Sequence, residues 1–358
     1  GGASTDDGRG RYRRRERLRM TRVPHGGVED PGVLDFSANT NPAVPVGAEV
    51  VFARSFARCD RYRVSHPRYT AAVADMCACP QSWVLPTGGG IAALSLAITA
   101  LVERDATVTV AGPTFGEYAR LVHIAGGQLR SVALNQLDTT HVSTSDLVIV
   151  CTPNNPCGRL ISAERRADLL RVAAAEEVPV LLDEAFIDFT EMPSAAGHPA
   201  AVVARSETKL FGLPGLRAGA LIVPPAYRDR VNAVCDPWPI GTPAATVAAY
   251  CLRQVPFIEA TRHRVGIERT RMRSALEPSY EVSPSAAPFM LCQPRDPVAL
   301  GLDPTDPVGD LCDRAAAVGI ALRDARSFEG YDQHIRIAVR RPHENDRVLA
   351  LLTGADHV

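Results

Sequence analysis

The sequence predicts an α/β fold in which a large domain with a mostly parallel sheet is joined to a smaller α+β domain. Its 358 residues suggest about two domains, at roughly 100–200 residues for each. Short apolar runs without alternation recur between longer helical patterns, which is typical of parallel strands covered on both faces. From Pro278 onward, prolines separate short segments, and this change of pattern indicates the smaller domain.

The predicted elements follow these patterns along the chain. Strands are expected over residues 106–111, 146–151, 178–183, 200–205 and 218–223. Helices are expected over residues 90–103, 116–126, 162–176, 225–234 and 243–254, followed by a long polar helix over residues 257–277. Residues 334–339 alternate between apolar and polar side chains, which predicts a half-buried strand in the smaller domain.

These patterns also divide the chain into domains. We expect residues 51–250 to form the large domain, and residues 23–50 to join residues 251–358 in the smaller one. Residues 1–22 are polar and then dense in arginine. Such a segment is either a basic arm for nucleic acid or membranes, or a disordered tail. We favour the tail, because nothing downstream extends the basic patch.

Composition excludes several classes of protein. With 46% hydrophobic and 22% charged residues, the chain can bury a core, and its net charge of −1 excludes a globally basic nucleic-acid binder. No apolar run reaches the length of about 20 residues that a membrane helix needs, and no secretory signal is visible. The nine cysteines are scattered, without zinc-site spacing. They predict reduced thiols, a cytoplasmic location and no metal site.

Lys209 is the single lysine, since the other 38 of the 39 basic residues are arginine. A lysine that persists alone is a candidate for chemistry that arginine cannot perform. Lysine can lose its proton and form a Schiff base, whereas arginine stays charged in proteins. The alternative is a chance survivor on the surface, so the neighbouring residues must decide.

Polar and glycine-rich segments follow the predicted strands, where α/β sheets bind ligands. Residues 87–90 place glycines at a helix start, a weak signal for phosphate binding. Residues 154–155 are adjacent asparagines in what is otherwise an Asn-Pro turn. Asp183 ends an apolar run, either as a helix cap or as the partner of a buried cation. Hydroxyls precede Lys209, and Arg217 follows it among glycines.

One ligand would use all of these groups. Pyridoxal phosphate (PLP) has an aldehyde for Lys209, a ring cation for Asp183 and a ring oxygen for Asn155. Its phosphate suits the glycine amides, hydroxyls and arginine, which are Gly89, Gly90, Ser206, Thr208 and Arg217. The combination is far more specific than any single segment.

At this point the chain resembles a known family, the class I and II aminotransferases of PLP-dependent fold type I. The resemblance covers about residues 23–350 and rests on four segments. These are Pro-Thr-Phe-Gly-Glu-Tyr (113–118), Asn-Asn-Pro-Cys-Gly (154–158), Asp-Glu-Ala-Phe (183–186) and Ser-Glu-Thr-Lys (206–209) with the downstream Arg217 and Gly219. It implies that the large domain binds PLP.

The resemblance also implies roles for single residues. Lys209 would hold the cofactor as a Schiff base and move a proton at the substrate Cα, and Asp183 would pair with the pyridinium nitrogen. Asn155 would bond the ring O3′ and Phe115 would stack on the ring. A tyrosine of a partner subunit reaches the phosphate in this family, which implies a homodimer with shared active sites. Tyr62 is the candidate. Because the usual Tyr-Pro pair reads Tyr62-Arg63 here, Tyr69 is the alternative.

Three features resemble the branch of this family that decarboxylates L-threonine O-3-phosphate in cobalamin biosynthesis. They are the His-Gly-Gly opening before residues 34–42, phenylalanine at position 186, and a C-terminal segment with Arg323 and Arg336. The resemblance implies a small phosphorylated amino acid as substrate, held by His25, Asn39, Arg323 and Arg336. The alternative branch transaminates histidinol phosphate. A non-enzymatic DNA-binding regulator is a third hypothesis, but residues 1–22 are too short for a helix-turn-helix module.

Overall fold

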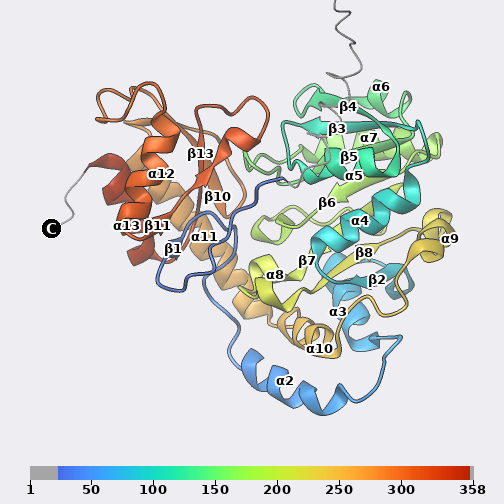
Figure 1. Ribbon diagram of the computed structural model, residues 1–358. Helices are drawn as coiled ribbons and strands as arrows, with labels where there is room; N and C mark the ends of the chain where they lie inside the picture. Colours follow the sequence, from blue (N-terminus) through green and yellow to red (C-terminus); the bar gives the residue numbers. More distant parts are fainter. Residues whose placement is uncertain (1–22, 355–358) are drawn as a thin grey trace, which may run out of the picture.

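The computed structural model describes residues 23–354, which form two lobes that share the long helix α11 (Val255–Leu276) as a connection (Figure 1). The basic segment 1–22 lies outside the described residues, so its predicted role as a tail stays a prediction. No helix in residues 23–354 is long and apolar enough to cross a membrane.

The larger lobe is built on a seven-stranded sheet in the order β2-β8-β7-β6-β5-β3-β4. Neighbouring strands from β7 to β4 pair in parallel, whereas β8 runs antiparallel to both β7 and β2. The mostly parallel sheet of the prediction is therefore confirmed. The strands are β2 (Val84–Thr87), β3 (Thr107–Gly112), β4 (Gln128–Ala133), β5 (Leu147–Cys151), β6 (Val180–Asp183), β7 (Ala201–Ser206) and β8 (Gly219–Ile222).

Both faces of this sheet are buried. Along β5, Val148 and Val150 join one apolar cluster, and Leu147 and Ile149 join the other. This explains why the strand is a continuous apolar run without alternation. Helices α4 (Gly90–Leu101), α5 (Glu117–Ala125) and α9 (Pro225–Val234) cover one face. Helices α3 (Pro67–Cys77), α6 (Thr139–Val142), α7 (Ala163–Ala175) and α10 (Thr242–Cys251) cover the other.

The prediction located five strands of the large sheet but missed β2 and β4. Both are edge strands. β2 contains Pro86, which is tolerated at a sheet edge because its missing N–H faces no neighbour. β4 is partly exposed and reads Gln-Leu-Arg-Ser-Val-Ala, without a clear apolar pattern. Because both strands lie at an edge of the sheet, they lack the continuous apolar run that identified the central strands.

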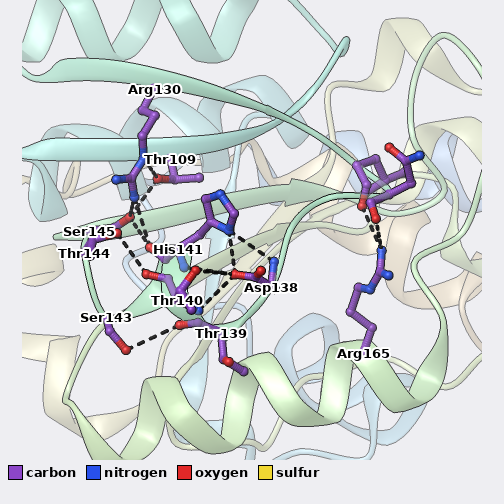
Figure 2. Close-up of polar contacts among 12 residues, drawn as sticks. Thr109, Arg130, Asp138, Thr139, Thr140, His141, Ser143, Thr144, Ser145 and Arg165 are labelled. Carbon is purple, nitrogen blue, oxygen red and sulfur yellow. Dashed lines mark hydrogen bonds and ion pairs between the residues drawn. The ribbon is translucent and has the colours of Figure 1, made fainter.

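The outer edge of the sheet is held by polar contacts that Figure 2 shows. Arg130 of β4 donates to the Thr109 hydroxyl of β3 at 2.8 Å and to the Ser145 hydroxyl at 2.7 Å. Asp138 caps α6. Arg165 of α7 donates hydrogen bonds to two carbonyls in the loop that precedes α6. These hydrogen bonds hold β4 at the edge of the sheet, whereas the central strands are held by apolar packing.

The smaller lobe contains a four-stranded antiparallel sheet in the order β12-β13-β10-β9. Its strands are β9 (Tyr280–Val282), β10 (Phe289–Pro294), β12 (Arg323–Asp324) and β13 (Ile335–Ala338), with helices α12 (Pro307–Ala317) and α13 (Pro342–Thr353) beside them. The strand β1 (Leu34–Asp35) pairs with β11 (Ile320–Ala321), so this early segment of the described residues lies against the smaller lobe (Figure 1). Helix α2 (Ala48–Ser55) runs across the expected boundary at residue 50 and packs on α10.

The expectation that residues 334–339 form a half-buried strand was wrong in one respect. β13 is buried at all four positions, including the 4%-exposed Arg336. The alternation in sequence is real, but the polar face of β13 is turned into the molecule, toward the cavity described next.

Candidate active site

A cavity of about 250 Å³ opens where β5, β6 and β7 end. Carboxyl ends of parallel strands meet at one edge of a sheet, which is the usual ligand position in this fold class. Of the residues that the sequence singled out, the cavity is lined by His25, Asn39, Gly90, Phe115, Asn155, Asp183, Ser206, Thr208, Lys209, Arg217, Arg323 and Arg336. Gly89 lies beside Arg217 at its rim, and Tyr62 lies outside it.

The start of α4 forms a cradle that is lined by backbone. Gly89 has a φ of 97°, and a Cβ there would lie 2.6 Å from Nη2 of Arg217. A Cβ on Gly90 would lie 3.0 Å from Cβ of Ser206. Amide groups at a helix start, a hydroxyl and a guanidinium together suit a phosphate. Glycine suits position 89 because other residues are strained at this φ, and a Cβ at position 90 would press on Ser206.

Two hydroxyls complete this cradle. The side chains of Ser206 and Thr208 lie 3.1 Å apart, on the turn from β7 into the short helix α8 (Glu207–Leu210). Both residues are buried and line the cavity. Their hydroxyl groups therefore face the cavity, where they can donate and accept hydrogen bonds.

Lys209 extends from α8 into the cavity. Burial, together with the charges of Arg336 and Arg217, lowers the pKa of its amine to about 8, although Asp183 opposes the shift. A lowered pKa leaves more of the amine neutral near neutral pH, which is the form that attacks an aldehyde. The alternative of a surface lysine is excluded.

Asp183 ends β6 inside the cavity, and the sequence analysis did not predict its hydrogen-bond donor. The Tyr118 hydroxyl of α5 donates to Asp183 Oδ2 at 2.5 Å, and the Ala185 amide donates to Oδ1 at 3.0 Å. Burial raises the pKa of Asp183, whereas these hydrogen bonds and Lys209 lower it. The carboxylate is held rigidly and has no arginine or lysine in contact among the described residues. A cation on a ligand would serve as its partner.

Arg336 joins the smaller lobe to the site. Its Nη1 donates to Asn155 Oδ1 at 2.5 Å and its Nη2 donates to the Ser37 carbonyl at 2.8 Å. The amide oxygen of Asn155 is thus committed to Arg336, and its NH2 group is the part left for a ligand. Burial and the charge of Arg323 lower the pKa of Arg336. No ion pair involving Arg336 occurs within residues 23–354.

Arg323 lies next to Arg336, on the paired strand β12. It donates to the Pro24 carbonyl at 2.6 Å and to the Ser327 hydroxyl at 2.7 Å, and its guanidinium lies 5.5 Å from the centre of the Phe328 ring. Like Arg336, it forms no ion pair with the described part of the chain. Two adjacent buried guanidinium groups without carboxylate partners favour the binding of an anionic ligand.

His25, Phe115 and Asn39 complete the mouth of the cavity. His25 lies 3.3 Å from a Glu117 carboxylate oxygen, and its ring is centred 5.6 Å from that of Phe115. Phe115 also contacts Tyr118 edge-on, at 5.7 Å between ring centres. The buried Oδ1 of Asn39 has no hydrogen-bond partner among the described residues, so it is available to a ligand.

Tyr62 is 83% exposed and lies against Trp238, at 4.6 Å between ring centres. It does not reach the cavity of its own chain, so its expected role depends on a partner subunit and stays a prediction. Tyr69 is 1% exposed. The alternative that Tyr69 enters a partner's site is therefore wrong, because its side chain is enclosed by its own chain.

The sequence analysis missed several residues of the site. Tyr118, Cys151 and Phe328, to which it gave no role, contact Asp183 or line the cavity. Tyr118 was inside a quoted segment, but only the structure shows that its helix turns it toward Asp183. Phe186 contacts Phe289 edge-on and gives the cavity an apolar wall.

Behind the Lys209 turn lies a buried acidic cluster that surrounds Arg205. Arg205 contacts Asp188 at 2.5 Å and Glu184 at 3.6 Å, and both oxygens of the buried Glu207 have no hydrogen-bond partner. Burial, with Asp188 adding to it, raises the pKa of Glu207 to about 7, although Arg205 opposes the rise. Glu207 is therefore protonated below neutral pH in the folded chain.

This cluster predicts a pH-dependent gain in stability for Glu207→Gln. A carboxyl whose pKa rises from 4.5 to about 7 on folding costs stability as pH rises through that window, and the cost stays above it. We expect the variant to be more stable by up to about 3 kcal/mol at pH 8 and by less than about 1 kcal/mol at pH 5. Thermal unfolding at both pH values measures this, with Glu259→Gln on the exposed side of α11 as control. Equal effects at both pH values would contradict it.

A buried lysine facing a glycine-lined phosphate cradle, at the carboxyl edge of a mostly parallel sheet, defines an enzyme of the PLP-dependent kind. The chain belongs to the aminotransferase class I and II family, whose model matches residues 35–352. This family uses pyridoxal 5′-phosphate, as the sequence predicted.

Two branches of the family occur among the relatives. The chain is 28% identical to a threonine-phosphate decarboxylase of Salmonella typhimurium, over 91% of this chain and 92% of the relative. It is 26% identical to a histidinol-phosphate aminotransferase of Archaeoglobus fulgidus, over 89% of this chain and 98% of the relative. The family rests on the model match over residues 35–352, and identity at this level leaves the branch open.

Solved structures agree with the fold. A histidinol-phosphate aminotransferase of Clostridium acetobutylicum superposes with a TM-score of 0.80 at 24% identity, covering 90% of this chain and 98% of that one. An L-threonine-O-3-phosphate decarboxylase of Porphyromonas gingivalis gives 0.79 at 22% identity, covering 90% and 99%. The predicted PLP-dependent fold type I architecture is confirmed.

The residues of this chain fit PLP. The cradle at Gly89 and Gly90 suits a phosphate, and Cβ atoms there would press on Arg217 and Ser206. Lys209 is placed for the aldehyde, and the buried Asp183 is placed for the ring nitrogen. The cradle, Lys209 and Asp183 lie on separate walls of one cavity, which is the arrangement that a planar ligand with a phosphate arm requires.

Proposed function

We propose that this chain decarboxylates L-threonine O-3-phosphate to (R)-1-amino-2-propanol O-2-phosphate, in cobalamin biosynthesis. The observation that carries the proposal is the pair of buried arginines, Arg323 and Arg336, beside Lys209. The cofactor phosphate has its own cradle, so these two guanidinium groups are left for the substrate. A phosphorylated amino acid brings two anions, a carboxylate and a phosphate.

The position of each arginine suggests which anion it takes. Arg336 lies deep in the cavity and contacts Asn155, beside the place for the cofactor ring. It suits the carboxylate on the reacting carbon. Arg323 lies nearer the mouth, where it contacts the carbonyl of Pro24 next to His25. These two residues suit the distal phosphate, since Arg and His⁺ both donate charge-assisted hydrogen bonds to phosphate oxygens.

When bound, PLP supplies an aldehyde for the substrate amine and a ring that withdraws electrons from Cα. The residues of the chain decide which Cα bond is broken, through the orientation in which they hold the substrate. Arg336 anchors the carboxylate, and Phe186 and Phe328 exclude water around it. A desolvated carboxylate favours loss of neutral CO2. Lys209 then has the reach and the lowered pKa to return a proton to Cα.

Product analysis tests the proposal. The PLP-loaded protein is given L-threonine O-3-phosphate without a keto acid, and CO2 and aminopropanol phosphate are followed by mass spectrometry. We expect both products in equal amounts without an amino acceptor. Turnover of histidinol phosphate that requires 2-oxoglutarate, with no release of CO2 from threonine phosphate, would assign the chain to the aminotransferase branch instead.

We also propose that the active enzyme is a homodimer. Large apolar side chains are exposed just before α2, on α2, on the 3₁₀ turn η1 (Phe56–Arg58) after it, and on the following loop; they include Val46, Phe52, Phe56, Tyr62 and Val64. Phe52 shares a shallow pocket with Gly88 and Arg217, so this apolar patch reaches the phosphate cradle. A second copy seated on it would bring its own loop to that cradle.

Sedimentation velocity tests the dimer. We expect a dimer for the unaltered chain, and weaker association by at least tenfold for Phe56→Asp, because a carboxylate cannot be buried unpaired in an apolar interface. Ile124→Asp, at an exposed apolar residue on α5 outside the patch, is the matched control. A monomeric protein that is fully active would contradict the proposal.

A further inference from the structure

Tyr118 is a buried phenol to which the proposed function assigns no role. It lies on α5 and is 0% exposed. Its hydroxyl donates to Oδ2 of Asp183 at 2.5 Å. Its ring packs edge-on against Phe115, with 5.7 Å between the ring centres and an angle of 81° between the rings. Tyr118 therefore touches both residues that the cavity offers to the cofactor ring, which are the aromatic side chain and the carboxylate.

The two carboxylate oxygens of Asp183 have different donors. The Ala185 amide donates to Oδ1 at 3.0 Å, so this contact belongs to the backbone after β6. Oδ2 accepts from Tyr118, and no other hydrogen-bond donor to Oδ2 occurs within residues 23–354. Cys151 pairs with Asp183 in the neighbouring strand β5, but its thiol donates to the Pro153 carbonyl at 3.3 Å. Tyr118 is therefore the side chain that satisfies Oδ2.

This hydrogen bond favours the charged form of Asp183. Burial raises the pKa of Asp183, and the Tyr118 hydroxyl is the largest of the effects that oppose the rise, ahead of the Ala185 amide and the charge of Lys209. Burial, together with the charge of Asp183, raises the pKa of the Tyr118 phenol well above its usual value. The phenol thus keeps its proton and remains a donor, and a donor to a carboxylate stabilises the ionised form.

The first turn of α5 holds Tyr118 in a fixed position. The neighbouring Glu117 is 3% exposed and accepts from Nε of Arg120 at 2.7 Å. Along the same helix, Leu121 and Val122 pack with Tyr118 in the apolar cluster on this face of the sheet. An ion pair and apolar packing therefore fix the helix that carries the phenol, so the distance from its hydroxyl to Asp183 is set by the fold.

An ionised carboxylate is the partner that a protonated ring nitrogen of PLP needs. Such a charge pair is stronger in a buried site than in water, and a carboxyl that has taken up a proton does not form it. We propose that Tyr118 is a positioning residue, which holds Asp183 ionised and directed at the ring nitrogen of the bound cofactor. The proposal rests on the cofactor alone and applies to both branches of the family, so it goes beyond the decarboxylation.

Cofactor affinity tests the proposal without a measurement of turnover. The cofactor-free unaltered chain and Tyr118→Phe are titrated with PLP, and the absorbance of the bound cofactor gives the dissociation constant. We expect Tyr118→Phe to bind PLP at least about tenfold more weakly, as for the loss of one hydrogen bond to a charged group. The variant keeps the ring that packs against Phe115. Tyr118→Met, which also lacks the donor, is a second variant should the first fail to fold.

Tyr280→Phe is the matched control. Tyr280 is also 0% exposed, and its hydroxyl donates to the Leu352 carbonyl at 3.0 Å in the smaller lobe, outside the cavity. Both substitutions remove one buried phenol hydroxyl, so both should lower the thermal stability. We expect Tyr280→Phe to bind PLP within about twofold of the unaltered chain, because the two sites are independent.

A cofactor analogue shows whether Tyr118 acts through the ring nitrogen. In deaza-PLP, a C–H group replaces this nitrogen, so Asp183 has no ring cation to pair with. We expect Tyr118→Phe and the unaltered chain to bind deaza-PLP within about twofold of each other, since the coupled group is absent. A double substitution gives the same test with PLP itself, because Tyr118→Phe should weaken binding little further in a chain that already carries Asp183→Asn.

Two results would overturn the proposal. One is an unchanged affinity of Tyr118→Phe for PLP. The other is an equal loss of affinity for PLP and for deaza-PLP, which would mean that Tyr118 only shapes the cavity. Neither result bears on the decarboxylase proposal, which the product analysis tests independently.

Discussion

Lys209→Ala is expected to abolish turnover, with a loss of at least about 10³-fold in kcat. The amine is the only one on a side chain of this sequence, and it lies buried at the cavity beside Asp183 and Arg336. Removal of a group that transfers a proton typically costs about 10²–10⁴-fold, and this residue also has a covalent role. Turnover of threonine phosphate by the purified variant measures the loss.

The covalent role has a readout that does not depend on activity. Borohydride reduction followed by mass spectrometry should add the mass of the cofactor to the unaltered chain and leave the Lys209→Ala chain unmodified. Lys209→Arg should behave like the alanine variant, because a guanidinium does not lose its proton to become a nucleophile. Cofactor that is trapped on either variant would refute the assignment of Lys209.

Arg336→Gln is expected to lower kcat/KM by about 10²–10³-fold. Arg336 is a buried cation that two neutral acceptors hold in place, the Asn155 amide oxygen and the Ser37 carbonyl. If it receives the substrate carboxylate, its loss removes a desolvated charge pair, and such a loss costs about 2–5 kcal/mol. Because the same contact fixes orientation at Cα, kcat should fall as well as KM rise.

Steady-state kinetics on threonine phosphate separates these two parts. Arg340→Gln is the matched control, because Arg340 lies just beyond the same strand but bonds to the Asp35 carbonyl and Glu344, outside the cavity. It should change thermal stability and leave KM nearly unaltered. An unchanged kcat/KM in Arg336→Gln would remove the argument from the two arginines and, with it, the main support for a doubly anionic substrate.

Arg336 shows that a residue can be assigned to the site correctly while its environment is predicted wrongly. Arg336 was named from the family resemblance and lay in a strand that was predicted to be half-buried, yet β13 is buried throughout. The residue was correctly placed at the cavity, and the environment was wrongly described. Periodicity gives the side of a strand on which a residue lies, but not whether that side faces solvent or a neighbouring lobe.

Asn155 gives a second instance. Its place at the end of β5 followed from the sequence, and the structure puts it in the cavity. Its oxygen is nevertheless held by Arg336, which lies 181 positions later in the chain. The Tyr118 hydroxyl likewise reaches Asp183 across 65 positions. Local motifs have no information about such partners, because these contacts depend on how separate elements pack.

By itself, the sequence determined the alternation of strands and helices, the mostly parallel sheet and the cofactor. These depend on local features: apolar runs, glycines before a helix, and a single lysine after two hydroxyls. The tertiary structure alone decided that two arginines of the smaller lobe meet Lys209, that Glu207 is buried against Arg205, and that Tyr118 donates to Asp183. The physical reason is that burial and charge pairing are set by contacts between distant segments, whereas periodicity and turn chemistry are set within a few residues.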